Sequence, residues 1–110
     1  MRAPELTRLG RDILEAAGWV TNCMNSRHPT PRGMLGFPDV PASRDGVHVQ
    51  IEVKAEGDRL NDHQKAYIEK MLPHLSNHLL LCLAESLEDF EQIANYRAED
   101  GLPGCEVRMT

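Results

Sequence analysis

The clearest pattern of apolar and polar positions lies in residues 47–54. Polar residues alternate there with four apolar, β-branched ones, Val47, Val49, Ile51 and Val53. Successive side chains of a β-strand point to opposite faces, so alternation with a period of two predicts a strand with one buried face. Glu52 and Lys54 occupy the intervening positions, and we therefore expect both on the opposite face of this strand.

The N-terminal segment predicts an amphipathic helix. It begins at Pro4, which suits a first helical turn, and Gly18 supplies a stop. Between them the apolar residues recur at three- and four-residue spacing, at Leu6, Leu9, Ile13 and Ala17. Residues 19–23 then predict a short strand.

The middle of the chain combines a loop with a second short strand. Residues 25–36 are polar and rich in proline, which is typical of a long loop, and such loops often contact ligands. Residues 37–40 predict the start of a strand, and residues 43–46 predict the turn that leads into the alternating segment.

The C-terminal half predicts two further helices around one strand. Asn61 can cap a helix that ends near Pro73 and whose apolar stripe consists of Tyr67, Ile68, Met71, Leu72 and Leu75. The uninterrupted apolar run at residues 79–84 is typical of a fully buried strand. Ser86 can cap a last helix, which we expect to end near Gly101.

The order of elements is therefore αβββαβα. This order predicts an α/β fold with a central mixed sheet flanked by helices. The chain has 110 residues, which is enough for one core, and we expect residues 1–110 to form a single domain.

Two carboxylates and an amine are the candidate catalytic groups. Asp39 follows Pro38 at the start of one predicted strand, and Glu52 lies on the polar face of the next. Antiparallel pairing would bring both carboxylates within reach of one hard cation, with the backbone carbonyl of Val53 as a third oxygen ligand. Lys54, two residues after Glu52, would then lie beside the metal and stabilise the charge of a transition state.

A simpler interpretation is also open for this pair. A glutamate and a lysine two residues apart on a strand occur by chance, and Glu52 and Lys54 could be the solvated side of a two-faced strand, loosely paired with each other. The combination with Asp39 and the residues that follow favours the catalytic interpretation.

The motifs in sequence order resemble a known family. They are Gly36-Phe37-Pro38-Asp39, then Ile51-Glu52-Val53-Lys54, then Gly57-Asp58-Arg59-Leu60 and Gln64. Over about residues 5–97 the chain resembles the virus-type replication-repair nucleases (VRR-NUC), a branch of the PD-(D/E)xK superfamily. It departs from the family pattern at Asp58, which is inserted between the glycine and the arginine of the turn.

The resemblance implies a restriction-endonuclease-like core and a metal-dependent DNA endonuclease that uses Mg²⁺ or Mn²⁺. Stand-alone members of this size resemble phage or prophage proteins that act as homodimers on branched DNA such as Holliday junctions. The metal ligands that it implies are Asp39, Glu52 and the Val53 carbonyl, and Lys54 is the catalytic amine.

The resemblance also points to two further site residues. Glu5 stands where the family has a glutamate early in the first helix, and it would assist the metal through water. An acid in a first helical turn is also favoured by the helix dipole alone. Gln64 matches the family's glutamine, yet it equally fits a capping box with Asn61, and the two roles are compatible.

Charge weighs against a polyanionic ligand at first, because the net charge is −5. The excess acid is concentrated in residues 71–110, which hold seven of the 17 acidic residues but only two of the twelve Lys and Arg. Bound cations would make the first part net positive. Arg27, Arg32, Arg59 and Lys65 are candidate DNA contacts.

Other features of the sequence exclude some classes of protein. The three cysteines are widely spaced, so neither a disulfide framework nor a zinc ribbon is expected, and no apolar run approaches a membrane span. We expect a cytoplasmic protein without a membrane segment. His74, His78 and Cys82 are spaced by four, but Pro73 and the change from helix to strand argue against zinc.

Three functions remain open from the sequence. The nuclease could act on branched DNA, or instead on flaps, nicks or plain duplexes. A non-catalytic nucleic-acid-binding module is the alternative from another class, and the acidic C-terminal part leaves room for an interaction protein without a nucleic-acid role.

Overall fold

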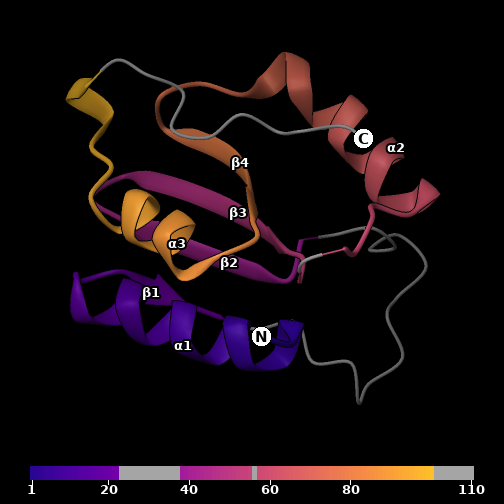
Figure 1. The fold of residues 1–110 in the computed structure, drawn as a ribbon. Helices are drawn as coiled ribbons and strands as arrows, with labels where there is room; N and C mark the ends of the chain where they lie inside the picture. The colour runs from indigo at the N-terminus through magenta and orange to yellow at the C-terminus, as the bar shows by residue number, and fades with distance from the viewer. Residues whose placement is uncertain (23–37, 56, 101–110) are drawn as a thin grey trace.

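The computed structural model describes residues 1–22, 38–55 and 57–100 (Figure 1). Its helices are α1 (Ala3–Ala16), α2 (Asp62–Met71) and α3 (Leu87–Ala94), with short 3₁₀ turns at Leu72–His74 and Ala98–Asp100. Its strands are β1 (Val20–Thr21), β2 (Val40–Arg44), β3 (Val47–Val53) and β4 (Leu79–Ala84). The predicted order of elements is confirmed. None of the helices in these three ranges is long and apolar enough to cross a membrane.

The four strands form one mixed sheet in the order β1-β2-β3-β4. The pairs β1-β2 and β2-β3 are antiparallel, and β3-β4 is parallel. A tight turn at Asp45 and Gly46, both with positive φ (50° and 79°), joins β2 to β3. Two successive residues with positive φ suit the right-handed twist of a hairpin, so the turn is narrower than the four residues predicted.

Helices cover both faces of the sheet. Figure 1 shows α1 and α3 on one side and α2 on the other. The main core lies under α1 and α3 and contains the apolar face of β3, all four residues of which are at most 4% exposed. Alternate residues of β4 face each way: Leu80, Cys82 and Ala84 belong to the main core, and Leu81 packs with Leu60 and Ile68 under α2.

The approach of α1 to α3 depends on a glycine. A Cβ atom at Gly10 would lie 2.5 Å from ring atoms of Phe90, which is fully buried in α3. No side chain fits at that distance without a shift of one helix. Gly10 therefore lets the two helices pack closely over the main core.

Several predicted details differ from the structure, and the first strand comprises only Val20–Thr21 rather than residues 19–23. Helix α3 ends at Ala94 rather than near Gly101, because Tyr96 turns into the core and donates a hydrogen bond to the Asn77 carbonyl at 2.9 Å. Strand β2 begins at Val40, so Asp39 lies in a bend before the strand. Leu72 is 49% exposed, because the 3₁₀ turn that contains Pro73 takes it out of the stripe of α2.

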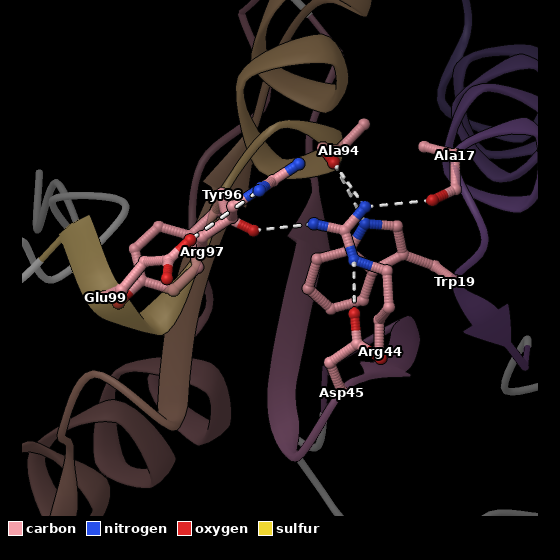
Figure 2. Close-up of polar contacts among 8 residues, drawn as sticks. All are labelled: Ala17, Trp19, Arg44, Asp45, Ala94, Tyr96, Arg97 and Glu99. Atoms are coloured by element: carbon pink, nitrogen blue, oxygen red, sulfur yellow. Dashed lines mark hydrogen bonds and ion pairs between the residues drawn. The ribbon is translucent and has the colours of Figure 1, made fainter.

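Arg44 fastens the ends of two helices to the end of β2 (Figure 2). Its guanidinium donates to the carbonyls of Ala17 and Ala94, both at 2.9 Å, and to that of Tyr96 at 2.7 Å. It also lies over the Trp19 ring, 4.6 Å from the centroid. Unpaired carbonyls at the C-terminal ends of helices attract cations, so one side chain satisfies the ends of both α1 and α3.

Helix α1 runs along the sheet, with its C-terminal end near Arg44. The C-terminal end of α1 is held at the Arg44 end of β2, and Figure 1 shows the N-terminal end of the helix toward the opposite end of the sheet, where β2 begins. A helix of 14 residues extends about 21 Å, close to the length of a seven-residue strand. Glu5 therefore lies toward the Asp39 end of the sheet.

Candidate active site

The β2-β3 hairpin brings the two predicted carboxylates together. Val40 pairs with Ile51 in the antiparallel register, and continuing the register by one residue sets Asp39 opposite Glu52. Directly opposite residues of an antiparallel pair carry their side chains on the same face of the sheet. Asp39 and Glu52, which are far apart in the sequence, thus share one point at the end of the hairpin.

Glu52 is buried, with 4% of its surface exposed. The interpretation of Glu52 as part of a solvated strand face is therefore wrong, since α2 covers this position. Burial is the main cause that raises the pKa of Glu52 to about 8, and the nearby carboxylate of Asp39 adds to it, whereas Lys54 acts in the opposite direction. Asp39 and Glu52 thus lie together at a buried point, and the charge of Lys54 only partly offsets the effect of burial and of Asp39 on the pKa of Glu52.

Asp39 is fixed by the backbone of β3. Its Oδ2 accepts a hydrogen bond from the Val53 N–H at 2.9 Å. In the continued register the residue opposite Val53 is Pro38, which has no N–H to donate. The ladder between the strands ends here, with the Asp39 carboxylate in place of a backbone acceptor.

The same register directs the carbonyl of Val53 toward the site. Lys54 N–H donates to the Ala84 carbonyl at 3.0 Å, so the backbone groups of alternate residues of β3 face β4 and those of Val53 face β2. Because Pro38 offers no N–H there, the ladder provides no donor for the Val53 carbonyl. A proline at this position thus leaves a backbone oxygen on the side of the two carboxylates.

Lys54 lies beside the acids at the end of β3. Its Nζ is 3.8 Å from Glu52 Oε1, and the two side chains are 15% and 6% exposed. The pair is long for a direct hydrogen bond, which leaves the ammonium protons available to another acceptor. The structure therefore brings Asp39, Glu52 and Lys54 together on the face predicted from the alternation.

Gln64 joins the site from α2. Its Nε2 donates to Glu52 Oε1 at 2.6 Å. Its Oε1 accepts from the Asn61 N–H at 2.8 Å, while its own N–H donates to Asn61 Oδ1 at 2.9 Å, which completes a capping box. The capping box predicted for Gln64 is confirmed, and the same side chain also contacts Glu52.

The donor set suits a hard divalent cation. It consists of two carboxylates and one backbone carbonyl, and oxygen ligands of this kind are those that Mg²⁺ and Mn²⁺ prefer. A cation between Asp39 and Glu52 would also remove the like-charge conflict at the buried glutamate. No group of three or more His, Cys, Asp or Glu side chains suited to a metal occurs in the described ranges, so water would have to complete the coordination.

His74, His78 and Cys82 do not share a site that could hold zinc. Cys82 is 1% exposed within the main core under α1 and α3. His74 and His78 are exposed, one in the 3₁₀ turn after α2 and the other just before β4. The spacing by four in the sequence does not bring these three side chains to one face.

A solved structure has the same fold. The chain superimposes on a structure described as a VRR_NUC domain with a TM-score of 0.65 and 18% sequence identity, over 86% of this chain and 97% of the other. The chain has a VRR-NUC-like fold. The sequence itself matches no family model and no curated protein.

Among the other predicted residues, Glu5, Arg59 and Lys65 lie in the described part of the VRR-NUC-like fold. Glu5 is exposed in the first turn of α1, and no contact between it and Asp39 or Glu52 is found among the described side chains. Arg59 is exposed in the connection before α2, and Lys65 is half-buried in its first turn, next to Gln64. Arg27 and Arg32 lie outside the described residues.

Two roles were not predicted from the sequence. Arg44 reads as a turn residue, and the two helix ends that it satisfies meet only in the fold. Tyr67, predicted to lie in the apolar stripe, donates its hydroxyl to Gln50 Oε1 at 2.5 Å, two residues before Glu52 on the same face. The spacing of Gln64 and Tyr67 by one helical turn was the available signal for this second contact.

Proposed function

We propose that the protein is a metal-dependent DNA endonuclease of the PD-(D/E)xK type. The observation that carries this proposal is the meeting of the Asp39 and Glu52 carboxyl groups at one point of the sheet, with Lys54 beside them. The VRR-NUC-like fold supports it. Oxygen donors beside an amine can both hold a hard cation and stabilise a phosphate that gains negative charge.

In the proposed reaction each residue has one task. Asp39, Glu52 and the Val53 carbonyl would hold Mg²⁺ or Mn²⁺, with Glu5 assisting through a water molecule. A cation held there would supply the positive charge that neutralises the phosphate and lowers the pKa of a water molecule. The Lys54 ammonium donates to the oxygen on which charge develops, and Gln64 keeps Glu52 in place.

Glu52 has to lose its proton before it can serve as a ligand. Its pKa of about 8 means that the proton is held at neutral pH when no cation is near. Because ligands bind a metal in the deprotonated form, the affinity for the cation should rise with pH up to about pH 8.

The substrate is proposed to be branched DNA, in the phage or prophage setting that the family resemblance implies. One protomer carries one site, so paired cuts across a four-way junction require a two-fold homodimer. Lys65 lies next to Gln64, and Arg59 lies in the connection before α2, where both would contact phosphates. Arg27 and Arg32 are proposed to do the same. Flaps, nicks and plain duplexes are the alternative substrates.

A cleavage assay tests the proposal. Labelled four-way junction, flap, nicked and plain duplex DNA are incubated with the protein and Mg²⁺, Mn²⁺ or EDTA, beside Lys54→Ala and Lys70→Ala. We expect cleavage that EDTA abolishes and that Lys54→Ala lowers by roughly 100- to 1,000-fold, the usual effect of removing one group that stabilises transition-state charge. Lys70, exposed in the last turn of α2, is the matched control because the same charge is removed away from the site.

The other outcomes separate the alternatives. Binding of DNA without cleavage in either metal would identify a non-catalytic binding module instead. Neither binding nor cleavage would point to an interaction protein. Cleavage that survives in Lys54→Ala at the level of Lys70→Ala would remove Lys54 from the mechanism.

A further inference from the structure

The first turn of α2 lies between the capping residue and the site. Asn61 is the N-cap, and Gln64 is the third residue of the helix. The two residues exchange two hydrogen bonds, Asn61 N–H to Gln64 Oε1 at 2.8 Å and Gln64 N–H to Asn61 Oδ1 at 2.9 Å. The second of these depends on the Asn61 side chain, and the first uses the side-chain oxygen of Gln64.

The cap determines which way the Gln64 amide faces. An amide side chain has one end that accepts and one that donates, and the two ends are hard to distinguish without their partners. Because Oε1 is bound to the Asn61 N–H, Nε2 has to point away from the cap, and it donates to Glu52 Oε1 at 2.6 Å. The hydrogen bond at the cap therefore sets the orientation in which the Gln64 amide donates to Glu52.

We propose that Asn61 is a positioning residue for the metal site, which acts through Gln64 to hold the Glu52 carboxylate in the orientation that binds the cation. The inference rests on the proposed function, since it concerns the same site. Asn61 itself touches neither carboxylate in the described contacts, so its role is to fix the residue that does.

The hydrogen bond from Gln64 to Glu52 matters because Lys54 alone does not fix the Glu52 carboxyl group. Lys54 Nζ is 3.8 Å from Glu52 Oε1, and Gln64 Nε2 is 2.6 Å from the same oxygen. The shorter, directional contact sets the rotation of the carboxyl group. Both contacts fall on Oε1, so Oε2 is the oxygen that neither of them occupies. Residues that orient ligands in this way commonly change metal affinity 10- to 100-fold when they are removed.

The rest of α2 is anchored independently of the cap. Tyr67 donates to Gln50 one turn further along the helix. Leu60 before the helix and Ile68 within it pack with Leu81 in the smaller core. Loss of the Asn61 side chain should therefore loosen the first turn and leave the helix docked on the sheet.

The test compares two helix caps, one at the site and one away from it. Asn61→Ala removes the side-chain acceptor of the α2 cap, which binds the Gln64 N–H, and keeps the Asn61 backbone N–H. Ser86→Ala removes the side-chain acceptor of the α3 cap, which binds the Asp89 N–H at 3.2 Å. Asn61→Ser keeps a side-chain acceptor at the α2 cap. Mn²⁺ affinity of the folded protein is measured by calorimetry and by electron paramagnetic resonance, with urea unfolding as the measure of stability.

We expect Asn61→Ala to weaken Mn²⁺ binding about 10-fold and Asn61→Ser to restore most of it. Ser86→Ala should lower the urea midpoint by a similar amount and leave Mn²⁺ affinity unchanged within twofold. In a Gln64→Leu background, Asn61→Ala should have no further effect on Mn²⁺ affinity, because the two residues act in series.

Equal Mn²⁺ affinities for Asn61→Ala and Ser86→Ala would overturn the inference and leave the proposed nuclease intact. Full additivity of Asn61→Ala and Gln64→Leu would overturn it as well, because Asn61 would then act by another route. Wild-type protein that binds no Mn²⁺ and cuts no DNA would instead remove the proposed function, and this inference with it.

Discussion

The two ends of the β2-β3 hairpin differ in how their charges are satisfied. At the turn, the single cation of Arg44 has three carbonyls and an aromatic ring as partners. At the open end, two carboxyl groups meet beside one amine, and burial raises the pKa of Glu52 to about 8. At the turn the charged group has a full set of partners, whereas at the open end a buried carboxyl group with a raised pKa lies beside a second carboxyl group.

The turn of the hairpin therefore contributes to stability, whereas its open end is the candidate site. A buried charge with a full set of hydrogen bonds stabilises a fold, whereas crowded like charges lower stability and are typical of sites that bind something. An open cavity of about 760 Å³ lies at the Arg44 end, lined by His78, Arg97 and Glu99 among others.

Among the substitutions, removal of the arginine should give the largest change in stability. Arg44→Met leaves the carbonyls of Ala94 and Tyr96 short of a donor, and hydrogen bonds to charged groups contribute about 1.5–3 kcal/mol each. We expect the free energy of unfolding to fall by about 3 kcal/mol in urea titrations. Mn²⁺ affinity of the folded fraction should not change.

Two matched variants sharpen that result. Arg44→Lys should recover only part of the loss, because an ammonium cannot reach three carbonyls as the guanidinium does. Arg97→Met is the control: its ion pair with Glu99 joins side chains that are 71% and 73% exposed (Figure 2), and the change should stay within about 0.5 kcal/mol. Equal effects of the two Met variants would refute the role of Arg44.

Gly10→Ala tests whether the packing of α1 against α3 affects the site at the open end of the hairpin. A methyl group at residue 10 would meet the Phe90 ring at 2.5 Å, so α1 and α3 have to separate. Overpacking of this kind costs about 1–3 kcal/mol, and thermal unfolding should report it. If Mn²⁺ affinity also falls more than twofold, the site is not independent of the packing between the helices.

The open end should show a pH dependence of stability when no metal is present. The pKa of Glu52 is raised from 4.5 to about 8, so the folded protein holds a proton that the unfolded chain has lost. The free energy of unfolding should therefore fall as the pH rises from about 4.5 to about 8, by at most about 1.4 kcal/mol per pH unit.

Glu52→Gln is the matched variant for this measurement. It replaces the protonated carboxyl with a neutral group of the same shape, and its stability should not follow this slope. Saturating Mn²⁺ should reverse the trend in the wild type only, since the cation binds the deprotonated carboxylate. Parallel slopes for the wild type and Glu52→Gln without metal would show that Glu52 does not titrate in this window.

Much of the fold followed from the sequence because burial leaves a periodic pattern. The alternation in β3 and the apolar run of β4 were predicted nearly to the residue. The end of α3 was placed too late, because Tyr96 and Ala98 continue its apolar spacing although the chain has already left the helix. Periodicity reports which residues are buried, and it does not report where helical hydrogen bonding stops.

The candidate site was only partly predictable. Motif spacing indicated Asp39, Glu52 and Lys54, and strand pairing explains why they meet. The burial of Glu52 was not visible, because it depends on α2 crossing the outer face of the sheet. The tasks of Arg44 and of the Asn61 cap depend on contacts between distant elements, which no local pattern records.

The location of Mn²⁺ in crystals of the protein shows directly whether Asp39 and Glu52 bind the metal. Anomalous scattering should give a peak within about 2.0–2.3 Å of carboxylate oxygens of both Asp39 and Glu52, with the Val53 carbonyl as a third ligand. Asp39→Asn crystals grown in the same way should lose the peak and keep the fold. A peak elsewhere, in protein that cleaves DNA with Mn²⁺, would contradict the account.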